Sequence, residues 1–351
     1  MRTRLLTLFT ILVTALFALT ANAQDKNAVG AVGPIKFSGL MFGDLFYNAN
    51  AINPANKDLN GFQFRRVYIT TDYTINDQFS TRFRMESAIS SGSNIGVFVK
   101  DAWLKWKNVF KGSDLIVGMS PTPAFDVSEG AWGYRSLEKT IMDYFGIVSS
   151  RDIGIDLKGK LDEDGVAKYW LKIGDGSGNK PETDKYKRYY AQLQFNPSSK
   201  LLITVYGDYA SHAPKFDAFD GQMKSNSAFV AAGFINYKQG KDFALGVESF
   251  IKSQQNNFTV GNAALQNQSG FGVSVWAHAM LSDKVGVIGR YDSYDPNTNS
   301  AITNDRQGLI IAAIDFKAAP KVSVMPGIEV HTVQGANDSD VTPRVTFFWQ
   351  F

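Results

Sequence analysis

The sequence contains no cysteine and only three histidines among its 351 residues. Without cysteine there is no disulfide framework, no thiolate nucleophile and no cysteine-based metal site. The histidines, His212, His278 and His331, are dispersed, and no serine–histidine motif surrounds His278 or His331. The pairing of a nucleophile with its base is therefore missing. We predict that the protein is not an enzyme and that it holds no metal ion or other cofactor.

Long apolar runs are also scarce. One uncharged apolar stretch extends from Leu5 to Leu19, behind a basic start and ahead of a small-x-small site that ends at Ala23. This arrangement is typical of a secretory signal peptide, and the stretch is too short for a comfortable transmembrane helix. No later apolar run reaches the ~18 residues that a helical span needs. The sequence predicts an exported protein with a signal peptide at 1–23 and a mature chain at 24–351.

The mature chain also has almost no net charge. Once Arg2 and Arg4 leave with the signal peptide, 34 basic side chains face 33 acidic ones. A nearly neutral chain lacks the basic surface that binds nucleic acid, so no nucleic-acid partner is expected. Aromatic residues, by contrast, are plentiful, with 26 Phe, 14 Tyr and 6 Trp. Many of them lie near the ends of predicted strands, as in the aromatic girdles of membrane barrels.

The last eleven residues, 341–351, carry a clear pattern. Every second residue is apolar or aromatic: Val341, Pro343, Val345, Phe347, Trp349 and Phe351. Such alternation over about 9–11 residues fits one tilted membrane-crossing β-strand. The terminal aromatic residue resembles the assembly signal of bacterial outer-membrane β-barrels, so Trp349 and Phe351 are the candidate assembly residues. An edge strand of a soluble sandwich would alternate in the same way, so the number of strands has to decide.

The same alternation recurs along the mature chain. It predicts sixteen strands, near 35–47, 61–71, 79–87, 97–107, 114–120, 151–161, 166–174, 187–196, 200–210, 227–238, 242–253, 269–281, 284–293, 306–317, 321–333 and 341–351. Seven short connections rich in turn formers alternate with eight mostly longer, polar ones. An up-and-down barrel with short periplasmic turns explains this order, whereas a Greek-key sandwich does not. We predict an all-β fold, a transmembrane antiparallel up-and-down β-barrel of sixteen strands with both termini in the periplasm.

The connection 121–150 departs from this pattern. Loops of this length are usually functional or disordered, and its aromatic content argues against disorder. Leu137, Ile141 and Phe145 are spaced to share one helical face. We predict that this third long loop folds inward against the barrel wall and constricts the pore. An extracellular helical cap is the alternative.

Four short motifs, mainly within residues 35–160, resemble the phosphate-selective porin family (porins O and P) in order and spacing. They are Phe64-Arg-Arg66, Lys100-Asp-Ala-Trp-Leu104, Gly118-Met-Ser-Pro121 and Arg151-Asp-Ile-Gly-Ile155. The resemblance implies a trimeric barrel in the outer membrane of a Gram-negative bacterium, where it carries small anions. It also implies outer-membrane lipid and the barrel-assembly machinery as partners. The chain departs from the family at Ser120, where a lysine usually precedes the proline.

A sixteen-stranded barrel is wide enough for a water-filled channel, whose selectivity depends on constriction size and wall charge. Arg65 and Arg66 cannot both face inward in a regular strand, and Arg66 is assigned to the lumen because Val67 and Ile69 then face lipid. The predicted channel-lining and constriction residues are Arg66, Arg82, Arg84, Glu86, Arg135, Glu138, Lys139, Arg151 and Asp152. Their positive balance predicts a modest preference for anions such as phosphate. The alternative is that these charges pair and stiffen the wall.

Taken together, these patterns predict an outer-membrane porin for the passive diffusion of small hydrophilic solutes. A structural or adhesin-type barrel without a transport role is the alternative, and a single-channel current would separate the two. Gly39 and Gly43 would lie flat on the lipid face, which suggests a contact between subunits.

Overall fold

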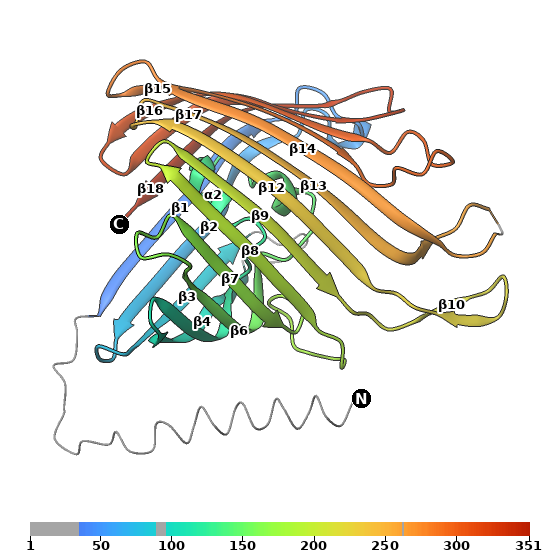
Figure 1. The fold of residues 1–351 in the computed structure, drawn as a ribbon. Helices are drawn as coiled ribbons and strands as arrows, with labels where there is room; N and C mark the ends of the chain where they lie inside the picture. The colour runs from blue at the N-terminus through green and yellow to red at the C-terminus, as the bar shows by residue number, and fades with distance from the viewer. Residues whose placement is uncertain (1–34, 89–95, 262) are drawn as a thin grey trace.

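The computed structural model describes residues 35–88, 96–261 and 263–351, in which sixteen antiparallel strands close into a barrel (Figure 1). The barrel strands are β1 (Lys36–Tyr47), β2 (Asn60–Thr74), β3 (Phe79–Ala88), β4 (Gly96–Phe110), β5 (Ser113–Pro121), β6 (Arg151–Lys160), β7 (Ala167–Gly174), β8 (Arg188–Ser198), β9 (Leu201–Ala210), β12 (Ala228–Gln239), β13 (Phe243–Phe258), β14 (Gln266–Met280), β15 (Val285–Asp295), β16 (Gln307–Ala319), β17 (Val322–Val333) and β18 (Asp340–Gln350). Each pairs with the preceding and the following barrel strand, and β1 pairs with β18. The predicted up-and-down barrel is confirmed. The predicted signal peptide, 1–23, lies outside the described residues.

Alternation along the strands separates an apolar outer face from a more polar inner face. On β9, Val205 and Tyr209 point outward and are 55 % and 48 % exposed, whereas Tyr206 and Asp208 point inward and are buried. Successive side chains of a strand point to opposite faces of the sheet, which produces this separation. An exposed apolar belt of this kind is stable when lipid surrounds it, so the chain is built as a transmembrane β-barrel.

The connections follow the predicted alternation of short and long. Short turns lie at the barrel end that also holds Phe351, and longer connections lie at the opposite end (Figure 1). The connection 48–59 contains a 3-10 turn, η1 (Pro54–Asn56). The connection 211–227 contains a hairpin of β10 (Lys215–Asp217) and β11 (Gln222–Lys224), where the sequence predicts only a loop. Strands of three residues are too short to show alternation, which is why the sequence did not reveal them.

The barrel closes where β1 meets β18. Backbone hydrogen bonds join Gly39 N to Phe351 O at 3.1 Å and Phe351 N to Gly39 O at 3.0 Å. The rings of Phe351 and Phe347 lie over Gly39 and Gly43, and a Cβ at Gly39 would be 2.2 Å from the Phe351 ring. The prediction that these two glycines leave a flat face is therefore wrong, because aromatic rings occupy the space above them. The contact between subunits at this place stays a prediction.

A β-bulge interrupts β2 close to this junction. Gly43 pairs with Phe64 and Phe42 pairs with Arg66, which leaves Arg65 as the extra residue. An extra residue shifts the alternation of a strand, so the side chains of Arg65 and Arg66 both enter the lumen. The prediction that just one of these arginines faces inward is therefore wrong, because it assumes a regular strand.

Candidate functional site in the lumen

The connection between β5 and β6, residues 121–150, enters the barrel and is called the inward-folded segment below (Figure 1). It contains α2 (Asp126–Trp132) and α3 (Ile141–Tyr144). Trp132, Ile141 and Met142 are completely buried. The segment forms two apolar clusters with inward side chains of β8 to β17, including Tyr190, Tyr206, Val230, Phe234, Phe250, Trp276, Ile288, Tyr294 and Leu309. The prediction of an inward-folded third long loop is confirmed, and the external cap is excluded.

The inward-folded segment is not one continuous helix. Gly133, with φ at +71°, ends α2, and the chain turns before α3 begins at Ile141. Leu137 packs in the cluster of Trp132, whereas Ile141 packs in the other cluster. The predicted helical face of Leu137, Ile141 and Phe145 is therefore wrong. No helix in the described part of the chain is long and apolar enough to cross a membrane.

Hydrogen bonds attach the segment to the wall at several points. The pairs include Ser128 Oγ to Glu248 on β13 (3.1 Å), the Tyr134 hydroxyl to Asp315 on β16 (3.2 Å), Gln192 on β8 to the Pro123 carbonyl, and Arg290 on β15 to the Lys139 carbonyl. Each such bond contributes about 0.5–1.5 kcal/mol, and a buried partner left alone costs more. These contacts and the apolar clusters together give the segment one defined position in the lumen.

The inner wall formed by β2, β3, β4 and β6 carries closely spaced basic side chains, which we call the basic wall. Its members are Arg66, Arg82, Arg84, Lys100 and Arg151. Asp101 accepts from Arg151 and lies 3.2 Å from Arg84, and Glu86 lies 2.9 Å from Arg66 and 3.0 Å from Lys100. Arg82 binds Asp72 through two hydrogen bonds of 2.7 and 2.9 Å. The members of the basic wall are therefore paired with acids.

The paired acids and bases differ in their access to the lumen. The side chains of Asp101 and Glu86 are 0 % and 2 % exposed, whereas that of Arg84 is 20 % exposed. A carboxylate lies close to the backbone, while a guanidinium ends a long stem and reaches beyond it. Arg82 is the exception, because its partner Asp72 is almost as exposed as Arg82 itself. Apart from the pair of Arg82 and Asp72, the basic groups of this wall are therefore more exposed than the acids with which they pair.

Tyr68 on β2 orients two of these arginines, and the sequence interpretation did not include it. Arg66 donates to the Tyr68 hydroxyl at 3.0 Å, and the guanidinium carbon of Arg84 lies 5.2 Å from the centre of the Tyr68 ring. Cation–π contacts and hydrogen bonds of this kind restrict a flexible arginine to one position. Alternation places Tyr68 on the same face as Arg66, and this signal could have identified it.

The inward-folded segment carries charges of both signs. Arg135 binds Glu129 at 2.7 Å and Asp143 at 3.1 Å, so its charge is compensated within the segment. Burial raises the pKa of Glu129, and the nearby Asp143 raises it further although Arg135 opposes the change. Burial would also raise the pKa of Glu138, but the Arg65 guanidinium, the backbone N–H of Lys139 and the charges of Lys139 and Arg135 together outweigh burial and lower this pKa to about 2. Glu138 is therefore ionised at neutral pH.

The structure brings together some of the predicted lumen residues and separates others. Arg84 and Arg151 meet at Asp101, and Glu86 lies between Arg66 and Lys100. The Lys139 carbonyl accepts from Arg290 on β15. Asp152 accepts from Gly176 N at 2.8 Å and from the Tyr190 hydroxyl at 2.7 Å, so it fixes the connection 175–187.

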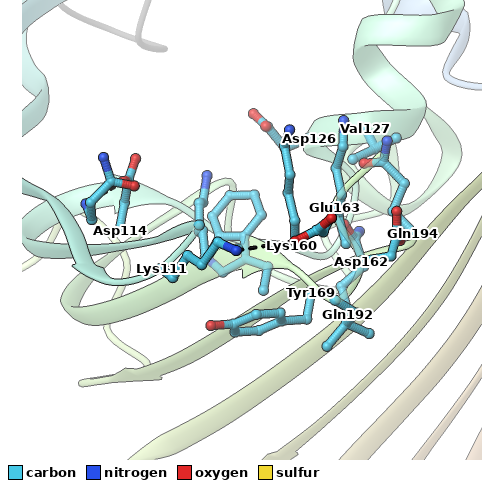
Figure 2. A pocket seen from close by; sticks show the side chains of 17 residues that line it. Lys111, Asp114, Asp126, Val127, Lys160, Asp162, Glu163, Tyr169, Gln192 and Gln194 are labelled. Carbon is cyan, nitrogen blue, oxygen red and sulfur yellow. Dashed lines mark hydrogen bonds and ion pairs between the residues drawn. The ribbon is translucent and has the colours of Figure 1, made fainter. Parts of the chain in front are cut away.

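A cavity of about 820 Å³ lies between α2 and the short turns of β4–β5 and β6–β7 (Figure 2). Its charged lining comprises Lys111, Lys158, Lys160, Lys168, Asp114, Asp126, Asp162 and Glu163. Lys111 binds Glu163 at 3.1 Å, and the ammonium group of Lys158 lies 3.1 Å from the centre of the Trp170 ring. Open space therefore continues from the inward-folded segment toward the end of the barrel with the short turns.

A second cavity of about 640 Å³ adjoins the first and shares Val127, Lys168 and Gln194 with it. The lysines in its lining are Lys168, Lys200, Lys238 and Lys241. Within the described residues, no acidic side chain lines this second cavity. Positive charge is thus present on the turn side of the segment as well as along the basic wall.

No family model matches the chain, and no curated protein matches its sequence. Solved structures match it along most of its length. OmpT of Vibrio cholerae in its trimer form is 13 % identical, with a TM-score of 0.60 over 92 % of this chain and 100 % of that chain. An anion-selective porin from Comamonas acidovorans is 9 % identical, with a TM-score of 0.65 over 91 % and 99 %. OprB of Pseudomonas putida is 9 % identical, with a TM-score of 0.66 over 90 % and 94 %.

This is the fold of outer-membrane porins. The similarity spans nearly the whole of each of these chains and of this sixteen-stranded barrel. At these identities the similarity concerns the fold. The narrower resemblance to phosphate-selective porins depends on the short motifs around Arg66, Lys100, Pro121 and Arg151.

Proposed function

We propose that this porin fold forms a water-filled channel in the outer membrane, through which small hydrophilic solutes diffuse passively. We further propose a modest preference for anions such as phosphate. The observation that carries the proposal is the unequal access of paired charges on the basic wall. Asp101 is fully buried, while Arg84 remains partly exposed to the lumen.

Electrostatics gives this arrangement its effect. Fixed positive charge in a confined passage with low-dielectric walls concentrates anions and repels cations. The lysine-lined cavity on the turn side of α2 would extend the same field along the path. Because Arg82 and Arg135 are neutralised by accessible acids, the preference is expected to be modest.

The remaining features of the proposal concern assembly. We propose a homotrimer, in keeping with the trimer form of the similar Vibrio cholerae OmpT. The terminal residues Trp349 and Phe351 are proposed to signal to the barrel-assembly machinery. The 1–23 segment is proposed to direct export, and residues 121–150 to form the constriction of the barrel.

Single-channel recording tests the channel itself. Purified, refolded protein is added to a planar lipid bilayer in symmetric potassium chloride, with a heat-unfolded sample as the control. Stepwise current increases of uniform size are expected from the folded protein alone. If folded protein that shifts its electrophoretic mobility on heating gives no steps, the structural-barrel alternative replaces the channel.

A further inference from the structure

The β-bulge in β2 places two neighbouring arginines in the lumen with different surroundings. Arg66 contacts Tyr68 and Glu86, which both belong to the barrel wall. Arg65 instead reaches the inward-folded segment: its guanidinium donates to the Ser136 carbonyl at 3.2 Å, to the Leu137 carbonyl at 2.5 Å and to the Glu138 carboxylate. Of these two adjacent arginines, Arg66 therefore contacts the barrel wall and Arg65 contacts the inward-folded segment.

The three acceptors lie in the part of the segment that has no helix of its own. Carbonyl groups outside a helix need partners elsewhere when they are buried. Ser136, Leu137 and Glu138 are all buried, and the Arg65 guanidinium supplies hydrogen bonds to each of them. A planar, forked guanidinium is suited to serve several oxygen atoms at once.

Arg65 also connects the segment to the junction of the first and last strands. Its guanidinium lies 3.8 Å from Asp44 on β1, which in turn lies 3.6 Å from Arg344 on β18. Arg344 binds Glu329 on β17 at 3.0 Å. Through these ion pairs the segment is connected to β1, β18 and β17, at the junction where the barrel closes.

We propose that Arg65 is the positioning residue of the inward-folded segment, acting through the Ser136 and Leu137 carbonyls and the Glu138 carboxylate. Arg66 lines the wall and does not hold the segment. For its effect on the pore aperture this assignment rests on the proposed channel function, whereas the contact with the segment is testable in any folded preparation.

The absence of cysteine from the sequence provides a direct probe. In a Ser136→Cys parent, the cysteine at position 136 is buried beside Arg65, and a maleimide reagent should label it slowly. The variants to compare in this parent are Arg65→Gln, Arg65→Lys and, as the matched control one residue away, Arg66→Gln. Only preparations whose electrophoretic mobility shifts on heating are compared, because this shift shows that the barrel is folded.

Arg65→Gln leaves Glu138 buried without its cation, so the segment should open more often and label about tenfold faster or more. Arg65→Lys keeps a charge near Glu138 but cannot serve both carbonyls, so an intermediate rate is expected. Arg66→Gln should label at the parent rate. Equal rates for Arg65→Gln and the parent, or an equal rise in Arg66→Gln, would overturn the assignment.

Single-channel recordings on the same variants separate this assignment from the proposed function. Arg65→Gln should give larger or less steady open-channel currents than the parent. If neither the parent nor Arg65→Gln passes current although the labelling rates follow the expected order, the channel function fails and the role of Arg65 stands. If the parent and Arg65→Gln pass identical current and are labelled at the same rate, the role of Arg65 fails and the channel function stands.

Discussion

At the scale of single residues, access to the lumen separates the charges more clearly than their number does. Arg84 and Arg82 lie two apart on β3 and project to one side, yet the partner of Arg84 is buried and that of Arg82 is not. Ion pairs that look equivalent in a sequence therefore contribute unequally to the field that a solute experiences. Alternation predicted the face of both arginines, but it could not predict the depth of their partners.

Replacement of Arg84 should change ion selectivity more than replacement of Arg82. One charge about 4 Å from a passing ion in water is worth about 1 kcal/mol, favourable for chloride and unfavourable for potassium, so Arg84→Gln should lower the chloride-to-potassium permeability ratio at least about fivefold. Arg82→Gln should change this ratio less, and Arg82→Glu with Arg84→Glu should move the pore toward cations. Reversal potentials in a salt gradient measure the ratio. Lys57→Glu, in an exposed loop, is the control.

The lowered pKa of Glu138 predicts how acid affects the segment. A carboxylate with a depressed pKa contributes stability that is present above its unfolded value of about 4.5 and is lost as pH falls toward about 2. Single-channel conductance should therefore stay constant between pH 7 and pH 5 and rise only well below pH 4. A Glu138→Gln variant should show the higher conductance at every pH. A rise already at pH 6 in the wild-type protein would contradict this role.

At the scale of elements, the strands could be predicted and the irregular parts could not. Sixteen alternating stretches were enough to predict the barrel and its topology, and the length and aromatic content of 121–150 were enough to predict its inward course. The β10–β11 hairpin is too short to alternate, and the turn after Gly133 interrupts the expected helical face. The bulge at Arg65 shifts the alternation, so that Phe62 and Phe64 before it and Ile69 after it all face outward. The prediction missed this shift because it treated the strand as regular.

Deletion of residues 126–146 should raise single-channel conductance about twofold or more, because the segment occupies part of the lumen and pore width controls current. The deletion also uncovers Phe234 and Trp276, so the isolated barrel should be less stable to heat. Unchanged conductance in folded protein would show that the segment does not limit ion flow. The point variant Ser128→Ala, which removes one hydrogen bond and keeps the segment, is the control.

Deletion of Phe351 should impair assembly. The deletion removes two backbone hydrogen bonds to Gly39 and the ring that covers it, at the junction where the barrel closes. The yield of heat-modifiable protein in the outer membrane should fall severalfold. Phe110→Ala removes another exposed aromatic ring near a short turn and should leave the yield unchanged. A normal yield after deletion of Phe351 would refute its role in assembly.

At the scale of the whole molecule, an almost neutral chain is expected to form an anion-preferring channel. Net charge alone gives no reason for this preference, since the full chain carries 36 basic and 33 acidic side chains. The arrangement supplies the reason: carboxylates lie deep in the wall, guanidinium groups lie nearer the lumen, and lysines line the cavity on the turn side. Selectivity in this account depends on where the charges lie and only weakly on their sum.

The anion preference of the wild-type protein is measured by its reversal potential in a potassium chloride gradient. It is measured in a planar bilayer with tenfold more salt on one side, at low ionic strength, where fixed charges are least screened. An anion-preferring channel should give a reversal potential on the chloride side of zero, modest in size and shrinking as salt is raised. A reversal potential on the potassium side would contradict the anion preference.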